Sequence, residues 1–120
     1  MNLIDYQDSR PIYEQITENY KTLILKGVLV PGEQMPSVRK LAMELSTNPN
    51  TVHRAYMLLE QQGYVQSVKG KGIFVSEINS TFMETKKQEI TEKLKALLDE
   101  AAETGIDIKE LLEGALDDND

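Results

Sequence analysis

The sequence predicts a mainly α-helical fold that contains one small β-hairpin and ends in a helical tail. Two helix starts follow each other closely in the middle of the chain, at Ser37 and at Asn48. Two short runs of β-branched and aromatic residues then surround residues 69–71. Beyond them, apolar residues recur at helical spacing along an otherwise charged stretch. This order predicts a winged helix-turn-helix domain over residues 1–76 and a two-helix tail over residues 77–120.

A first helix is expected to begin near Pro11 and to cover the back of the helix-turn-helix. Its apolar residues recur at helical spacing, and Gly27 supplies a stop signal. Residues 1–10 are expected to form an extended lead-in, and residues 31–32 predict a turn. We interpret the tyrosines and methionines of this region as core residues. The apolar positions of the helix are Ile12, Ile16, Tyr20, Leu23 and Ile24.

Two short helices joined by a tight turn are predicted next. Ser37 can accept hydrogen bonds from the free amides of a helix that begins at Val38. Asn48 can cap a second helix in the same way, with Pro49 at its first position. Residues 46–47 are too few and too polar to form anything but a turn. This arrangement is typical of a helix-turn-helix, whose second helix fits the major groove of DNA.

The second of these helices has one apolar and one polar face. At about 100° per residue, Val52, Ala55 and Leu59 fall on one side and are expected to pack on the preceding helix. Asn and Arg can make bidentate hydrogen bonds to adenine and guanine, whereas Thr and His can reach phosphates or bases. A polar face can also be merely solvated, and that alternative stays open for this helix taken alone. The opposite face carries Asn50, His53, Arg54 and Met57, with Thr51 on its flank.

A β-hairpin is predicted after the second helix. The runs Tyr64–Val68 and Gly72–Ser76 are rich in β-branched and aromatic residues, and Lys69-Gly70-Lys71 separates them. Glycine lets a backbone approach phosphates or the floor of a minor groove, and lysine supplies positive charge. We therefore interpret the hairpin as a wing that contacts DNA. The alternative is an ordinary hairpin with a solvated tip.

Between residues 9 and 76, five short motifs occur in the order Pro11–Ile16, Gly27–Gly32, Pro36–Ala42, Asn50–Tyr56 and Gly70–Val75. Together they resemble the amino-terminal domain of the GntR-type transcription regulators. The short segment that follows them resembles the YtrA-like subfamily of that family. The resemblance implies a winged helix-turn-helix that binds double-stranded operator DNA, followed by a two-helix tail that serves for dimerisation.

The resemblance also implies which side chains contact DNA. They lie at the front of the first motif helix, on the recognition helix and in the wing. Two positions depart from the family pattern, because Pro49 removes a polar contact that Ser or Thr often supplies and His53 replaces what is commonly Arg. The candidate DNA contacts are Ser37, Arg39, Lys40, Asn48, Asn50, Thr51, His53, Arg54, Lys69, Gly70 and Lys71.

The tail is predicted to contain two amphipathic helices, one from Thr81 to about Thr104 and one that Asp107 caps. Two helices of this size cannot enclose a core, so their apolar stripes must be buried against something else. Packing against the winged domain of the same chain is one option. We favour dimerisation, because two-fold proteins read two-fold DNA sites. The candidate dimerisation residues are Met83, Ile90, Leu94, Leu97, Leu98, Ala101, Ile108, Leu111 and Leu112.

The net charge of −7 is distributed unevenly along the chain. Residues 1–76 hold eight Lys and Arg against seven Asp and Glu, whereas residues 77–120 hold five against thirteen. Within residues 37–75 the ratio is five to two. The segment that is expected to face DNA is therefore locally positive, and the acidic surplus lies in the tail.

The residues that the sequence lacks exclude several classes of function. There is no cysteine and a single histidine, so we expect no disulfide, no metal site, no cofactor and no enzyme activity. No signal peptide or membrane-spanning stretch is recognisable, and we expect a cytoplasmic protein. The leading hypothesis is a homodimeric, sequence-specific repressor that binds a palindromic operator. The alternative is a winged-helix module for protein–protein assembly, and nothing in the sequence points to a small-molecule effector.

Overall fold

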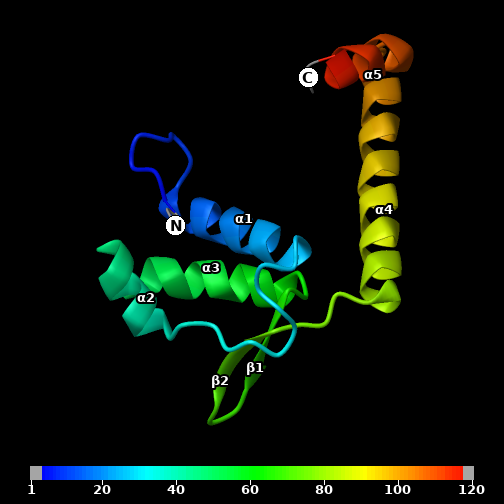
Figure 1. The fold of residues 1–120 in the computed structure, drawn as a ribbon. Helices are drawn as coiled ribbons and strands as arrows, with labels where there is room; N and C mark the ends of the chain where they lie inside the picture. The colour runs from blue at the N-terminus through cyan, green and yellow to red at the C-terminus, as the bar shows by residue number, and fades with distance from the viewer. Residues whose placement is uncertain (1–3, 118–120) are drawn as a thin grey trace. The chain divides into compact units, whose positions relative to one another are not determined.

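The computed structural model describes residues 4–117. Within that range the chain forms five α-helices and one two-stranded antiparallel hairpin (Figure 1), which confirms the predicted fold class. The chain divides after Asn79 into two compact units. None of the helices in this range combines the length and the apolar character that a membrane crossing requires. The elements are α1 (Ile12–Leu25), α2 (Val38–Leu45), α3 (Pro49–Gln61), β1 (Val65–Val68), β2 (Gly72–Val75), α4 (Ser80–Thr104) and α5 (Ile108–Asp117).

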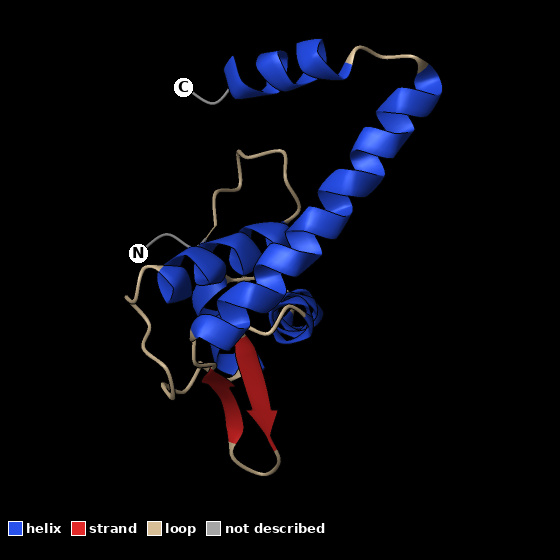
Figure 2. Cartoon of the chain, turned by 90° about the vertical axis from the view of Figure 1, so that its right-hand side faces the viewer, coloured by secondary structure: helices blue, strands red, loops and turns tan. Residues whose placement is uncertain are grey.

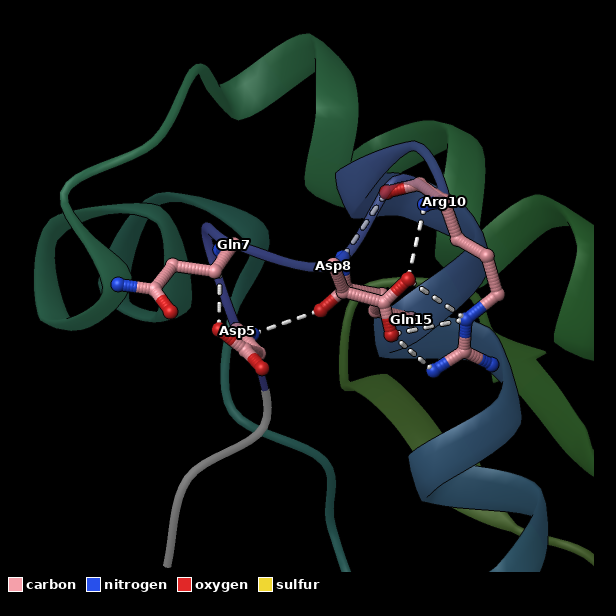
Figure 3. Close-up of polar contacts among 5 residues, drawn as sticks. All are labelled: Asp5, Gln7, Asp8, Arg10 and Gln15. Atoms are coloured by element: carbon pink, nitrogen blue, oxygen red, sulfur yellow. Dashed lines mark hydrogen bonds and ion pairs between the residues drawn. The ribbon is translucent and has the colours of Figure 1, made fainter.

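The segment before α1 is folded back rather than extended, so that expectation is wrong for the described residues 4–10 (Figure 3). The buried side chain of Gln15 is the reason, because its amide needs partners away from water. Its Oε1 accepts from the Asp5 amide at 2.7 Å, and its Nε2 donates to the Arg10 carbonyl at 2.9 Å. Asp8 also accepts from the Arg10 guanidinium at 2.8 Å, and the hydrogen bonds from the side chain and the main-chain amide of Arg10 lower the pKa of Asp8.

Both predicted helix caps are confirmed. The Ser37 hydroxyl accepts from the Lys40 amide at 3.1 Å, and the Asn48 side chain accepts from the Asn50 amide at 2.8 Å. Between the helices, Ser46 adopts a left-handed conformation with φ of 52° and so ends α2 in a tight turn. The helix-turn-helix thus follows from local signals at both of its helix starts.

The core of the first unit lies between α1, α2 and α3. Val52, Ala55 and Leu59 are buried as predicted, and Tyr56 joins them. The ring of Tyr56 meets that of Tyr20 edge to face, with centroids 6.2 Å apart, and the Tyr56 hydroxyl donates to the Pro36 carbonyl at 2.8 Å. Burial raises the pKa of Tyr56 well above its usual value. The aromatic pair therefore ties α1 and α3 to the segment that enters α2.

The predicted hairpin is confirmed, and it projects away from α1 and α3 (Figures 1 and 2). The sequence did not indicate a third segment that pairs with it. The Met35 amide donates to the Ile73 carbonyl at 2.7 Å, and the Val75 amide donates to the Glu33 carbonyl at 2.8 Å. Residues 31–36 have a proline at each end and no alternating pattern, which hid this pairing. It fixes the hairpin to the chain just before α2.

The second unit consists of α4 and α5. The Asp107 carboxylate accepts from the Glu110 amide at 3.3 Å, which confirms the predicted cap of α5. Gly105, with φ of 77°, ends α4. Ala101 is the one buried residue among the described positions of this unit. The apolar side chains of α4 and α5 are otherwise exposed or half-buried, and Ile90 and Leu97 leave more than 60% of their surface open (63% and 62%).

Candidate nucleic-acid interface

The face of α3 that points away from the core is open to solvent. Asn50, His53, Arg54 and Met57 are exposed, and Thr51 is half-buried on the flank, as the helical periodicity predicted. Pro49 begins the helix at this open end. An exposed helix face with amide, imidazole and guanidinium groups offers hydrogen-bond donors and acceptors to the edges of bases.

Arg54 does not extend freely into solvent. Its guanidinium carbon lies 3.8 Å from the centroid of the Tyr13 ring, which α1 carries in its first turn. The interpretation of the early tyrosines as core residues is therefore incomplete for half-buried Tyr13, and it is wrong for Tyr6, which is 65% exposed. Nothing in the spacing of the sequence relates Tyr13 to Arg54, because the crossing of α1 and α3 brings them together.

The start of α2 presents three polar side chains. Ser37, Arg39 and Lys40 are exposed, and the Ser37 hydroxyl that caps the helix can still donate its own proton. A groove separates this helix start from the hairpin, and Ser37, Val38, Val68 and Lys71 are among the residues that line it. The structure thus brings Ser37 of the predicted α2 residues, and Gly70 and Lys71 of the predicted wing residues, to the two sides of one groove.

The tip of the hairpin carries the predicted wing residues, all of them exposed. These residues are Lys69, Gly70 and Lys71. Sequence reasoning missed Gln34, whose Nε2 donates to the Lys71 carbonyl at 3.0 Å. It also missed the reason for glycine at position 72, where φ is +124° and a Cβ atom would lie 2.7 Å from that Nε2. Gln34 and Gly72 therefore determine the conformation of the hairpin tip.

The positive charges of this surface have no carboxylate partners within the described part of the chain. The ion pairs found among residues 4–117 join Arg10 to Asp8, Lys21 to Glu18 and Lys86 to Glu89. None of them involves a basic residue of the segment 37–75. Unpaired surface cations can neutralise phosphates without first giving up an internal partner. The unpaired cations are Arg39, Lys40, Arg54, Lys69 and Lys71.

Comparison with known proteins identifies the family. Residues 12–75 match the family described as "Bacterial regulatory proteins, gntR family". The chain is 43% identical to the HTH-type transcriptional repressor YtrA of Bacillus subtilis (strain 168) over 111 residues, which are 92% of this chain and 85% of that protein.

Two solved structures share the fold of this chain. A transcriptional antiterminator from Listeria monocytogenes EGD-e superimposes with a TM-score of 0.68 and 36% identity, covering 100% of this chain and 90% of that one. AraR(DBD), crystallised in complex with operator ORE1, superimposes with a TM-score of 0.54 and 27% identity, covering 61% of this chain and 89% of that one.

The match to YtrA runs through most of the chain, so it includes part of the tail as well as the winged domain. The chain therefore belongs to the GntR family, as a DNA-binding transcription regulator of the short YtrA-like type and not an enzyme.

Proposed function

We propose that the protein is a homodimeric repressor that binds a palindromic operator and occludes the promoter beneath it. The observation that carries this proposal is a set of five basic side chains on α2, α3 and the hairpin of one unit, none of which forms an ion pair with a carboxylate of residues 4–117. The similarity to YtrA, a repressor, supports repression rather than activation. A protein with this task acts where the chromosome is, in the cytoplasm.

Within each subunit, α3 is the element that enters the major groove. Asn50 and Arg54 are suited to bidentate contacts with adenine and guanine, and Thr51 and His53 reach neighbouring bases or phosphates. Asn48 caps the end of α3 that leads into the groove. Base contacts by these side chains determine the operator sequence.

The two flanking elements hold the phosphate backbone. Ser37, Arg39 and Lys40 extend from the start of α2, and Lys69 and Lys71 extend from the hairpin beside it. Gly70, with φ of +76°, keeps the tip free of a side chain, so its backbone can approach the DNA closely. The phosphate contacts fix the register of α3 on the duplex but read no sequence themselves, whereas Ser37 and Arg39 can also reach a base.

The exposed apolar residues of α4 and α5 are the proposed dimer interface. Each Leu or Ile side chain that becomes buried contributes about 1.5–3 kcal/mol, so a few of them suffice for a stable pair. Ala101 is withdrawn from this set, because it is already buried within the chain. The competing arrangement, in which the tail folds onto its own winged unit, requires a monomer in solution. The proposed interface residues are Met83, Ile90, Leu94, Leu97, Leu98, Ile108, Leu111 and Leu112.

Selection of bound sequences from random DNA tests the proposal. We expect a palindrome whose half-sites lie about 10–10.5 bp apart, centre to centre, or a multiple of that spacing. A single unrepeated half-site would contradict the two-fold arrangement. Failure to retain any DNA at low salt, where nonspecific binding is strongest, would instead favour the protein-assembly alternative.

A further inference from the structure

The contact between Arg54 and Tyr13 joins the proposed recognition helix to α1. The distance of 3.8 Å from the guanidinium carbon to the ring centroid is well inside the range of about 6 Å over which such pairs attract each other. Arg54 is exposed and Tyr13 is half-buried, so the stack lies at the surface of the unit. The guanidinium carbon lies over the Tyr13 ring.

Stacking covers the face of a guanidinium and leaves its edge free. The five N–H groups of arginine point outward in the plane of the group, and that plane is fixed once the face rests on a ring. Among the described residues, no carboxylate forms an ion pair with Arg54. The side chain is therefore held in one orientation while its donors remain available to a ligand.

The main chain on both sides of the stack is also held. The Thr17 hydroxyl lies 2.8 Å from the Tyr13 carbonyl and 3.4 Å from the carbonyl of Ala55, the residue after Arg54. Thr17 is buried, so this contact between α1 and α3 is sheltered from water. The main chains that carry the ring and the guanidinium thus approach the same buried hydroxyl.

From this geometry we infer that Tyr13 is a positioning residue for DNA recognition. Its ring fixes the guanidinium plane of Arg54, so that two N–H groups meet the O6 and N7 acceptors of one guanine together. Without the ring, the arginine retains its charge but loses its preferred plane. Tyr13 then contributes to the choice of base at one operator position without touching the DNA. This inference rests on the proposed function.

A double-mutant cycle tests the inference. Affinity is measured for two duplexes: the selected operator, and the same operator with another base in place of the guanine that Arg54 is proposed to contact. The proteins compared are the unaltered chain, Tyr13→Leu, Arg54→Ala and the double variant. We expect Tyr13→Leu to reduce the preference for guanine roughly 2- to 5-fold, the range of a surface cation–π contact. In the Arg54→Ala background the same change should have no further effect on that preference. Tyr13→Phe keeps the ring and should behave like the unaltered protein.

The preference ratio separates positioning from a general loss of structure. A partly unfolded variant binds both duplexes less well by the same factor, so its ratio is unchanged. Lys21→Met is the matched control, because Lys21 makes a similar contact 5.6 Å from the Tyr64 ring and lies outside the proposed DNA surface. It should leave the ratio intact.

Three outcomes would overturn the inference. In the first, Tyr13→Leu leaves the guanine preference unchanged, and in the second, it lowers that preference equally in both backgrounds. Either result means that the ring does not act through Arg54. In both cases the proposed function survives, because the operator is still bound. If the unaltered protein binds neither duplex at low salt, the proposed function fails, and this inference fails with it.

Discussion

The side-chain amide of Gln34 donates a 3.0 Å hydrogen bond to the main-chain carbonyl of Lys71 at the tip of the hairpin. Gln34 also forms a bridge with Phe74, and it lies only three residues before the cap of α2 at Ser37. The hairpin tip and the start of α2 are therefore braced by the same short segment. In the proposed complex, these are the two elements that hold the phosphate backbone.

Gly72→Ala should displace the hairpin tip. A Cβ atom at this position would lie 2.7 Å from the Gln34 Nε2, and the backbone has a φ of +124° that side chains rarely adopt. Strain of this kind costs roughly 1–3 kcal/mol, so we expect a lower free energy of unfolding and weaker DNA binding. Chemical denaturation and a binding titration measure the two effects. Gly114→Ala is the matched control. A Cβ atom at position 114 has no neighbouring atom within 4 Å, and the position lies in α5, where alanine should stabilise the helix relative to glycine.

Substitutions of Ser37 should separate the cap of α2 from the proposed DNA contact. Ser37→Ala removes the hydrogen bond to the Lys40 amide, which should cost about 0.5–2 kcal/mol of stability. Ser37→Asp keeps a capping oxygen but brings a negative charge towards the phosphates. We expect it to unfold like the unaltered protein and yet to bind DNA less tightly. If both variants bound DNA normally, Ser37 would be a structural residue alone.

Lys71→Ala should reduce the salt dependence of DNA binding. Each neutralised phosphate releases counterions, so removal of one contact should lower the slope of log affinity against log salt by about 1. Affinity for operator and nonspecific DNA should fall together, since phosphates carry no sequence information. The measurement is a series of titrations at different salt concentrations. Lys109→Ala, on α5 in the other unit, should leave the slope unchanged.

Stability should decline in strongly alkaline solution because of the buried tyrosines. Burial raises the pKa values of Tyr56 and Tyr20, so both stay neutral in the folded chain at pH values at which they ionise in the unfolded chain. The contribution of the two neutral tyrosines to the free energy of unfolding is intact below about pH 10, the usual pKa of tyrosine, and is lost as the pH rises above it. Tyr56→Phe should flatten this decline in a series of thermal melts. It should also cost about 0.5–1.5 kcal/mol at neutral pH, because the Pro36 carbonyl loses its donor.

Local signals made much of the fold predictable. Ser37, Asn48 and Pro49 determine where α2 and α3 begin, because caps act through the nearest free amides. The spacing of Val52, Ala55 and Leu59 was enough to orient α3, since each helical turn repeats the same face. The hairpin followed from two β-rich runs around a glycine-containing tip.

The features that escaped prediction depend on contacts between distant segments. Tyr13 and Arg54 meet because α1 crosses α3, and no periodicity of either helix contains that information. Gln34 reaches Lys71 only after the hairpin has folded against residues 33–35. The folded-back segment before α1 depends on one buried amide, that of Gln15, in a helix whose pattern otherwise predicts apolar residues inside.

In the proposed complex, two copies of the chain, joined through their tails, place two α3 helices on one operator. The mass of the complex with the selected palindrome, measured by sedimentation, gives the number of chains bound. Leu97→Glu inserts a charge into the proposed interface, and Gln88→Glu adds the same charge elsewhere on α4, also at an exposed position. We predict two chains per duplex for the unaltered protein and for Gln88→Glu, and a monomer with weak operator binding for Leu97→Glu. One unaltered chain per duplex, or full operator binding by a monomeric Leu97→Glu variant, would contradict the account.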